Sequence, residues 1–214
     1  MIPKLVIFDC DGVLVDSEPV TDRAMALNLA RYGLTLSESE VHKLFVGGTI
    51  KGAGEEATRM GANLPENWVD EMYGETFAAL RQGVDVLPGV YGLLDKITAQ
   101  GIKIAIASNG PVAKMEITLP PVDLWDRFAG RIYSGHDHGA KPAPDMILKI
   151  MADAGVRPAD TVMIDDSMPG CLSAINAGAR CLGFVADGDP TRFDNTPIEP
   201  VAHMDDIAGL IGLG

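Results

Sequence analysis

The sequence feature that most constrains the fold is a short apolar run that ends in two closely spaced acids. Leu5 to Phe8 are apolar, Asp9 and Asp11 follow, and Gly12 allows a sharp turn directly after them. The run is typical of a buried strand. Such a strand brings both carboxylates to the C-terminal edge of an open α/β sheet, where these sheets bind ligands. Taken alone, the two acids are equally compatible with a solvated turn.

Residues 17–83 differ in pattern from the rest of the chain, because they contain helical patterns and no strong strand. The expected helices cover residues 17–32, 35–45, 51–60 and 65–80, with a Gly-rich break at 46–49. Because this segment begins directly after the first pair of acids, we expect an inserted α-helical cap domain that can close over the strand ends.

Strand-like runs and helical patterns alternate again from residue 84. The expected strands cover residues 102–107, 131–134, 161–164 and 181–185, the last being the last clear strand. This alternation predicts an α/β fold, a doubly wound parallel sheet that forms a Rossmann-like core. The catalytic core would comprise residues 1–16 and 84–214, and the cap residues 17–83.

Three later strand ends or loops carry polar side chains that would meet the first pair of acids. They supply Ser108 with Asn109, then Lys141, and finally Asp165 with Asp166. Each has a simpler explanation by itself, namely a helix cap, a solvated loop lysine and turn residues. Because parallel strands end at one edge of the sheet, we expect these side chains to lie together.

Four carboxylates in one pocket would repel one another unless a cation lay among them. Oxygen ligands favour a hard ion, so the sequence predicts Mg²⁺ rather than zinc. His136 and His138 could face one side of a strand extension, but no third zinc ligand accompanies them. A metal, a lysine and a hydroxyl are groups that phosphoryl transfer uses.

Asp9 is favoured as the nucleophile of that reaction, because a carboxylate is ionised at neutral pH without a partner base. Ser108 would need such a base, and no His or second Lys is adjacent to it in the sequence. Asp11 would then give a proton to the leaving oxygen and later take one from water.

Taken together, these motifs resemble the haloacid dehalogenase superfamily of phosphohydrolases over the whole chain. The four motifs of that family correspond to Phe8–Val13, Ser108-Asn109, Lys141-Pro142 and Asp165-Asp166-Ser167. The helical insert is similar to the cap of the subgroup that includes β-phosphoglucomutase and many sugar-phosphate phosphatases. Shorter stretches around Ser108, Tyr133 and Val162 are similar to bacterial 6-phosphogluconate phosphatases.

The resemblance implies a role for each motif residue. It implies Asp9 as nucleophile and Asp11 as general acid/base, with Lys141 in the catalytic set. It implies that the phosphate is bound by Ser108, Asn109 and Lys141. It implies that Mg²⁺ is held by Asp9, the backbone carbonyl of Asp11 and an acid of the fourth motif, Asp166 with Asp165 beside it.

The implied function is a Mg²⁺-dependent phosphatase that hydrolyses a small phosphorylated sugar or sugar acid through an aspartyl-phosphate intermediate, with 6-phosphogluconate as a candidate. One alternative is a phosphosugar mutase, although Thr21 and Ile50 stand where β-phosphoglucomutases carry His and Arg. The other is a phospho-accepting regulatory domain, which would need neither the insert nor Asp11. Thr49, Lys51 and Lys114 are candidates to contact a second anionic group of the substrate.

Charge and composition limit the partners. A net charge of −13 argues against nucleic acid and anionic membranes, and no apolar run approaches the length of a membrane helix. The three cysteines lack metal-type spacing and are typical of reduced thiols, so we expect a cytoplasmic protein. The expected partner is a small phosphorylated metabolite. A monomer is compatible with the sequence, which sets no oligomeric state.

Overall fold

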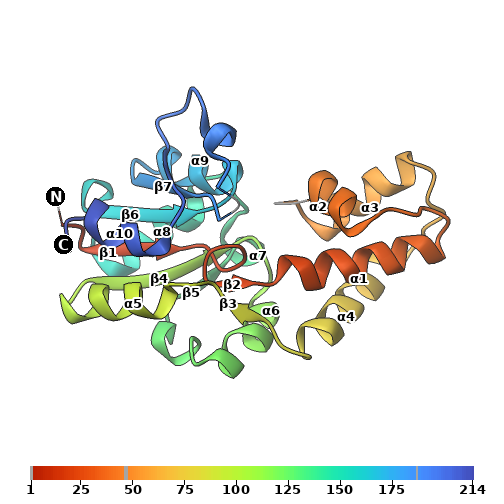
Figure 1. Cartoon of the computed structure of the whole chain (residues 1–214), viewed down its shortest axis with the longest axis horizontal. Helices are drawn as coiled ribbons and strands as arrows, with labels where there is room; N and C mark the ends of the chain where they lie inside the picture. The colour runs from red at the N-terminus through yellow and green to blue at the C-terminus, as the bar shows by residue number, and fades with distance from the viewer. Residues whose placement is uncertain (1, 46–47, 187) are drawn as a thin grey trace. The chain divides into compact units, whose positions relative to one another are not determined.

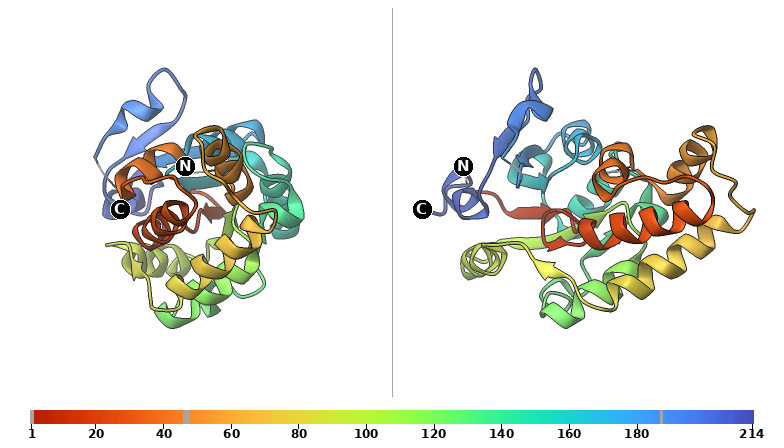
Figure 2. Two further views of the ribbon diagram at one scale, coloured as in Figure 1. Left: turned by 90° about the vertical axis from the view of Figure 1, so that its right-hand side faces the viewer. Right: turned by 45° about the vertical axis from the view of Figure 1, so that its right-hand side comes forward.

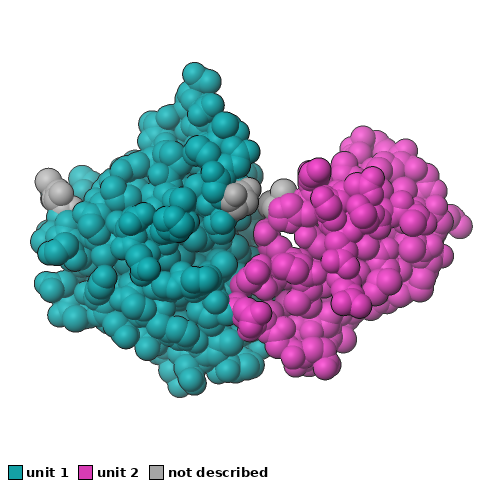
Figure 3. Space-filling view, viewed as in Figure 1, with its two compact units in different colours: residues 1–15, 86–214 teal, residues 16–85 magenta. Residues whose placement is uncertain are grey.

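The structure, a computed structural model, describes residues 2–45, 48–186 and 188–214. Val46 and Gly47, part of the expected break at 46–49, lie outside the described residues. The chain divides into two compact units, residues 1–15 with 86–214 as unit 1 and residues 16–85 as unit 2 (Figure 3). Within the described part of the chain, no helix has the length and apolar character needed to cross a membrane.

Unit 1 is built on a six-stranded sheet in which every pairing is parallel (Figure 1). Its spatial order is β5-β4-β1-β6-β7-β8. The strands are β1 (Leu5–Phe8), β4 (Lys103–Ser108), β5 (Ile132–Ser134), β6 (Thr161–Asp165), β7 (Arg180–Phe184) and β8 (Glu199–Val201). The first strand of the sequence lies at the centre, as a doubly wound sheet requires. The predicted α/β fold with a Rossmann-like parallel sheet is therefore confirmed.

Helices cover both faces of this sheet (Figure 2). They are α5 (Val90–Ala99), α6 (Val112–Thr118), α7 (Gly135–His138), α8 (Asp145–Ala154), α9 (Met168–Asn176) and α10 (Met204–Leu210). Among the described residues, the connections contain four short 3₁₀ helices: Pro120–Val122, Asp126–Phe128, Pro158–Asp160 and Pro190–Phe193. Helices α5 and α10 pack against each other on one face, and α8 and α9 cover the other.

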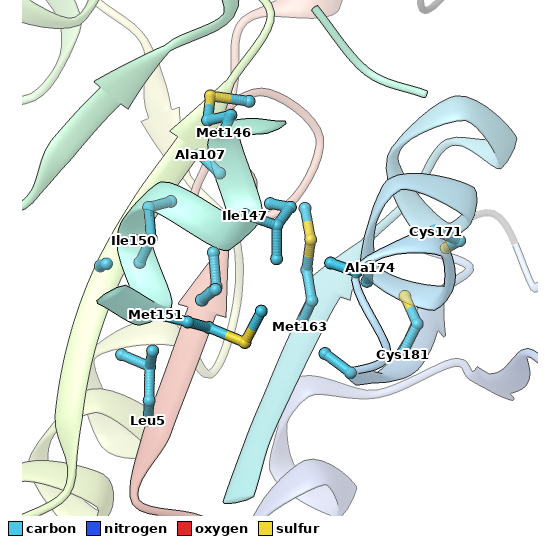
Figure 4. Packing of buried hydrophobic residues seen from close by; sticks show 14 of the residues in the cluster. Leu5, Ala107, Met146, Ile147, Ile150, Met151, Met163, Cys171, Ala174 and Cys181 are labelled. Carbon is cyan, nitrogen blue, oxygen red and sulfur yellow. The ribbon is translucent and has the colours of Figure 1, made fainter. Parts of the chain in front are cut away.

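Strand β1 is apolar throughout because both of its faces are buried. Leu5 and Ile7 pack into a cluster with side chains of α8 and α9, including Met146 and Ala174 (Figure 4). Phe8 faces the opposite side, where its ring makes an edge contact with Phe128 at a centroid distance of 5.9 Å. A strand that is buried on both faces reads as a continuous apolar run, as this one does.

The strand register brings the polar strand ends to one edge. Phe8 of β1 pairs with Ile106 of β4 and with Ile164 of β6. Asp9 therefore follows its strand at the level of Asp165, which ends β6, and one residue before the end of β4. The Asp9 N–H still donates to the Ile164 carbonyl at 2.9 Å. The ends of the three central strands of the sheet lie next to one another.

The structure differs from the sequence-based expectation at two places. The sheet continues beyond residues 181–185, because β8 adds an edge strand. Pro200 and the neighbouring turn residues gave this segment no strand pattern, although proline is tolerated in an edge strand. His136 and His138 lie in α7 and not in a strand extension. Ser134 ends β5 as the N-cap of that helix, because its Oγ accepts from the His136 N–H at 3.1 Å.

Unit 2 consists of α1 (Glu18–Arg31), α2 (Glu38–Phe45), α3 (Ile50–Arg59) and α4 (Trp68–Leu80). Helices α1 and α4 lie side by side in all views (Figures 1 and 2). Between them, the Trp68 indole N–H donates to the Asn28 amide oxygen at 2.6 Å, and the Asn28 amide group donates to Glu71 and Glu75. This network satisfies an asparagine that is fully buried.

The chain passes between the two units at two short strands. Strand β2 (Val15–Asp16) and strand β3 (Asp85–Val86) form a two-stranded sheet of their own. The Leu87 N–H extends this contact by donating to the Leu14 carbonyl at 3.1 Å. The insertion therefore begins and ends at adjacent points of the backbone.

Glycine is required at position 183 of β7, and this requirement can be tested. A Cβ there would lie 2.4 Å from a ring carbon of Phe193 and 2.7 Å from Ile198 Cγ2. We expect Gly183→Ala to lower the free energy of unfolding by about 1–3 kcal/mol, because the added methyl overpacks the core. Chemical denaturation monitored by circular dichroism measures this loss.

The matched control is Gly92→Ala in the first turn of α5, where a Cβ meets no atom within 4 Å. This change should raise the free energy of unfolding by about 0.5–1 kcal/mol, because alanine favours a helix over glycine. Equal stability of the two variants would contradict the packing assigned to Gly183.

Candidate active site

The ammonium group of Lys141 lies between two carboxylates at the strand ends. Its Nζ is 2.7 Å from Asp9 Oδ1 and 2.7 Å from Asp165 Oδ2. All three residues are buried. Asp9 follows β1 and Asp165 ends β6, so one cation joins the ends of two adjacent strands.

Asp165 is held on its other side by the start of α9. Its Oδ1 accepts from the backbone N–H of Ser167 at 2.9 Å and from the Ser167 hydroxyl at 2.7 Å. Gly170 makes this position possible, because a Cβ there would lie 2.0 Å from the Asp165 carboxylate. Both oxygens of Asp165 therefore accept hydrogen bonds from the protein.

Asp166 is half-buried and lies next to the turn that follows Asp9. A Cβ on Gly12 would lie 2.5 Å from Asp166 Oδ2, and Gly12 has a φ of +75°. Glycine is therefore needed there for the backbone conformation and for the approach of the carboxylate. Carboxylate oxygens of Asp9, Asp165 and Asp166 lie within 4.8 Å of one another.

A second lysine lies at Asp11. The Lys114 Nζ is 2.8 Å from Asp11 Oδ1, and the two side chains are 16% and 21% exposed. Lys114 comes from α6, which follows β4. The lysine therefore reaches back over the end of one strand to the acid that follows the neighbouring strand.

Ser108 and Asn109 organise the loop that carries Lys141. The Asn109 side chain accepts from the Lys141 backbone N–H at 2.8 Å and donates to the Lys141 carbonyl at 3.4 Å. Ser108 Oγ is buried and accepts from the Gly110 N–H at 3.0 Å, so that its own hydrogen can point to an acceptor. Asn109 thus fixes the backbone from which the Lys141 side chain extends.

Burial and charge act against each other in this cluster. Burial, with Asp165 and Asp11 as further negative charges, raises the pKa of Asp9 to about 7, although Lys141 lowers it in part. Burial by itself would lower the pKa of Lys141, but attraction by Asp165 and Asp9 outweighs burial and raises it. The pKa of Lys114 is raised in the same way, since Asp11 outweighs burial. Both lysines are therefore cations at neutral pH.

The donor set fits a hard divalent cation. Four carboxylates and two ammonium groups, when all are ionised, leave two negative charges in a partly buried cluster. Every ligand atom in the acidic group is a carboxylate oxygen, the type that Mg²⁺ and Ca²⁺ prefer. Gly12 and Gly170 provide the clearance that brings these oxygens together.

The structure brings together eight of the residues that the sequence singled out. Asp9, Asp11, Ser108, Asn109, Lys114, Lys141, Asp165 and Asp166 all belong to unit 1. Thr49 and Lys51 belong to unit 2, where Thr49 caps α3 by accepting from the Gly52 N–H at 3.1 Å and Lys51 is exposed on that helix. Their contact with substrate stays a prediction.

Three features of the site were not predicted from the sequence. They are the ion pair of Lys114 with Asp11, the hydrogen bond from the Lys141 backbone to the Asn109 side chain, and the space that the missing side chains of Gly12 and Gly170 leave for the carboxylates. The position of Lys114 within the first turn of a helix that follows a strand end was a usable signal. That turn lies at the C-terminal edge of the sheet.

Comparison with known proteins shows the family of the chain. The sequence model of the haloacid dehalogenase-like hydrolases matches residues 3–178. The chain is 28% identical to the 6-phosphogluconate phosphatase of Escherichia coli over 210 residues, which cover 97% of this chain and 94% of that protein. It is 30% identical to phosphoglycolate phosphatase 1 of Pseudomonas aeruginosa over 194 residues, covering 84% and 68% of the two chains.

The fold is shared with solved structures as well. A haloacid dehalogenase-like protein of unknown function from Agrobacterium tumefaciens superposes with a TM-score of 0.84 at 30% identity, and the match covers 97% of each chain. The family match includes all four motifs from Asp9 to Asp166, so the resemblance predicted from the sequence is confirmed. The chain belongs to the haloacid dehalogenase-like hydrolases.

Proposed function

We propose that this protein is a phosphoric monoester hydrolase that acts on a small phosphorylated sugar acid through an aspartyl-phosphate intermediate, with Mg²⁺ as its cofactor. The observation that carries the proposal is the Lys141 ammonium group, which binds Asp9 and Asp165 at the ends of adjacent strands. Two phosphatases that the chain resembles along most of its length support the same class of reaction.

In the first step, an Asp9 carboxylate oxygen attacks the phosphorus atom of the substrate. The bond from this oxygen to phosphorus forms, and the bond from phosphorus to the ester oxygen breaks. The electron pair stays on the ester oxygen, which takes a proton from Asp11 and leaves as an alcohol. Lys141, Ser108 and Asn109 are suited to bind the phosphoryl oxygens, whose charge spreads in the transition state.

In the second step, water attacks the phosphorus atom of the aspartyl phosphate. Asp11, now a carboxylate, takes a proton from that water, and the bond between Asp9 and phosphorus breaks. Inorganic phosphate is released, and both acids return to their starting protonation states. The same residue thus serves as acid and then as base.

Mg²⁺ would supply positive charge against the phosphoryl oxygens and the acids. We assign its direct side-chain contacts to Asp9 and Asp166, and a backbone contact to the carbonyl of Asp11. Asp165 is better suited to orient Lys141, because its two oxygens already accept from Lys141 and Ser167. The hydrogen bonds of Asp165 support this division.

The proposed substrate class follows from the named relatives. 6-Phosphogluconate and phosphoglycolate, the substrates in their names, both carry a carboxylate as well as a phosphate group. Recognition of that second anion requires a cation or hydrogen-bond donors, because the protein has a net charge of −13. We therefore favour phosphorylated hydroxy acids, sugar acids among them, over neutral sugar phosphates.

A panel of substrates tests the proposed function directly. We expect phosphate release with Mg²⁺ from 6-phosphogluconate and phosphoglycolate at kcat/KM values at least about tenfold above that for glucose 6-phosphate, since one favourable contact gives about that factor. Asp9→Asn should lower kcat by at least about a thousandfold, because the covalent step is lost. A coupled assay of inorganic phosphate measures both effects.

The matched control is Asp206→Asn, the same change at an exposed residue of α10, which should leave kcat unchanged. Retention of a tenth of the wild-type kcat in Asp9→Asn would contradict the role of the nucleophile. Conversion of glucose 1-phosphate to glucose 6-phosphate without phosphate release would instead indicate a mutase.

The raised pKa of Asp9 predicts how Mg²⁺ affinity depends on pH. Burial raises the pKa of Asp9 to about 7 in the metal-free protein, so the carboxyl group binds a proton below this value. Mg²⁺ must displace that proton, and its Kd should rise about tenfold for each pH unit below about 7 and level off above it. Isothermal titration calorimetry across this range measures the slope and the released proton.

The Asp9→Asn variant provides the control for this experiment. It carries no titrating group at that position, so its weaker Mg²⁺ binding should vary much less between about pH 6 and about pH 7. A wild-type Kd that stays constant over the same interval would show that Asp9 does not lose a proton when the metal binds.

A further inference from the structure

The ion pair of Lys114 and Asp11 has no part in the reaction as described so far. It joins two side chains that are largely shielded from water, at a distance of 2.8 Å. Exposed ion pairs contribute little to stability. The pair of Lys114 and Asp11 differs from them, because removal of one partner would leave the other charge partly buried and without its partner. Both residues lie within unit 1.

The backbone that carries Lys114 is fixed. The Lys114 N–H donates to the Pro111 carbonyl at 3.0 Å, and the Lys114 carbonyl accepts from the Thr118 hydroxyl at 3.2 Å. The side chain then runs past Gly110, where a Cβ would lie 3.6 Å from Lys114 Cδ. The Lys114 side chain therefore extends from a hydrogen-bonded helical turn and passes next to Gly110 before it contacts Asp11.

The contact distinguishes the two oxygens of Asp11. Lys114 binds Oδ1, whereas Oδ2 lies on the side of Gly110, 3.9 Å from where a Cβ of that residue would be. A general acid is effective only when its oxygen is held within reach of the leaving-group oxygen. A cation that binds one carboxyl oxygen restricts the rotation that would exchange the two.

We propose that Lys114 is a positioning residue, which holds Asp11 so that one carboxyl oxygen faces the ester oxygen of the substrate. This role rests on the proposed function, because it requires Asp11 to act as the general acid. Lys114 exchanges no proton in either step and acts only through Asp11. The pair favours this role over the sequence-based expectation that Lys114 contacts a distal anion of the substrate.

Leaving groups of different acidity separate positioning from a structural effect. Because Asp11 also serves as the base of the second step, which is common to all substrates, the comparison uses kcat/KM, which reports the first step alone. We expect Lys114→Met to lower kcat/KM about 10- to 100-fold for the alkyl phosphate that wild type hydrolyses fastest, because an alkoxide needs the proton of Asp11. For 4-nitrophenyl phosphate, whose leaving group needs no proton, the loss should be below about threefold. Lys114→Arg should restore most of kcat/KM for the alkyl phosphate.

Two further variants serve as a control and as an alternative for this comparison. Lys96→Met makes the same change at an exposed lysine of α5 and should alter neither substrate's kcat/KM. Lys114→Gln removes the charge with a polar side chain, and provides the same comparison if the methionine variant does not fold. Thermal unfolding shows which variants are folded.

A double-mutant cycle tests whether Lys114 acts through Asp11. In the Asp11→Asn background, Lys114→Met should change the alkyl-phosphate kcat/KM by less than about twofold, because the group that it positions is already absent. Full additivity, equal losses of kcat/KM on both leaving groups, or a raised KM with unchanged kcat would each overturn the positioning role. Wild-type protein that releases phosphate from no substrate would overturn the proposed function, and this role with it.

Discussion

The contact of one buried ammonium group with two buried carboxylates is the interaction on which the rest of the site depends. Lys141 binds Asp9 after β1 and Asp165 at the end of β6, and these two strands are neighbours in the sheet. Loss of one member of such a buried set costs about 3–5 kcal/mol, because the remaining charge is left without a partner. The lysine is therefore a structural cross-link between strand ends as well as a cation suited to bind phosphate.

Steric clearance is the second requirement of the same cluster. Carboxylates that repel one another approach closely only where no side chain separates them from the neighbouring backbone. Gly12 and Gly170 provide this space beside Asp166 and Asp165, in the turn after β1 and in the first turn of α9. The close approach of the carboxylates thus depends on two residues that carry no charge. The electrostatic properties of the cluster are therefore set by local packing as well as by the charged side chains.

Much of the core could be predicted from the sequence, because its strands are apolar and end in polar motifs. The run from Leu5 to Phe8 indicated a central strand, which the pairing of β1 with β4 and β6 confirms, and the family match confirms the resemblance. Strand β8 was not predicted, because its formation depends on pairing with β7 and its own sequence has no apolar strand pattern. The ion pair of Lys114 and Asp11 was not predicted either, since the residues are far apart in the sequence and a local pattern does not show where their side chains point.

The pairing of β2 with β3 has a consequence for the evolution of such enzymes. The chain leaves the sheet domain and returns to it at hydrogen-bonded neighbours, so the two ends of the inserted segment are already a few ångströms apart. A segment with joined ends can be exchanged, lengthened or shortened without a change in the register of the central sheet. The inserted segment can in this way be replaced as a module, while the groups at the strand ends of the sheet keep their arrangement.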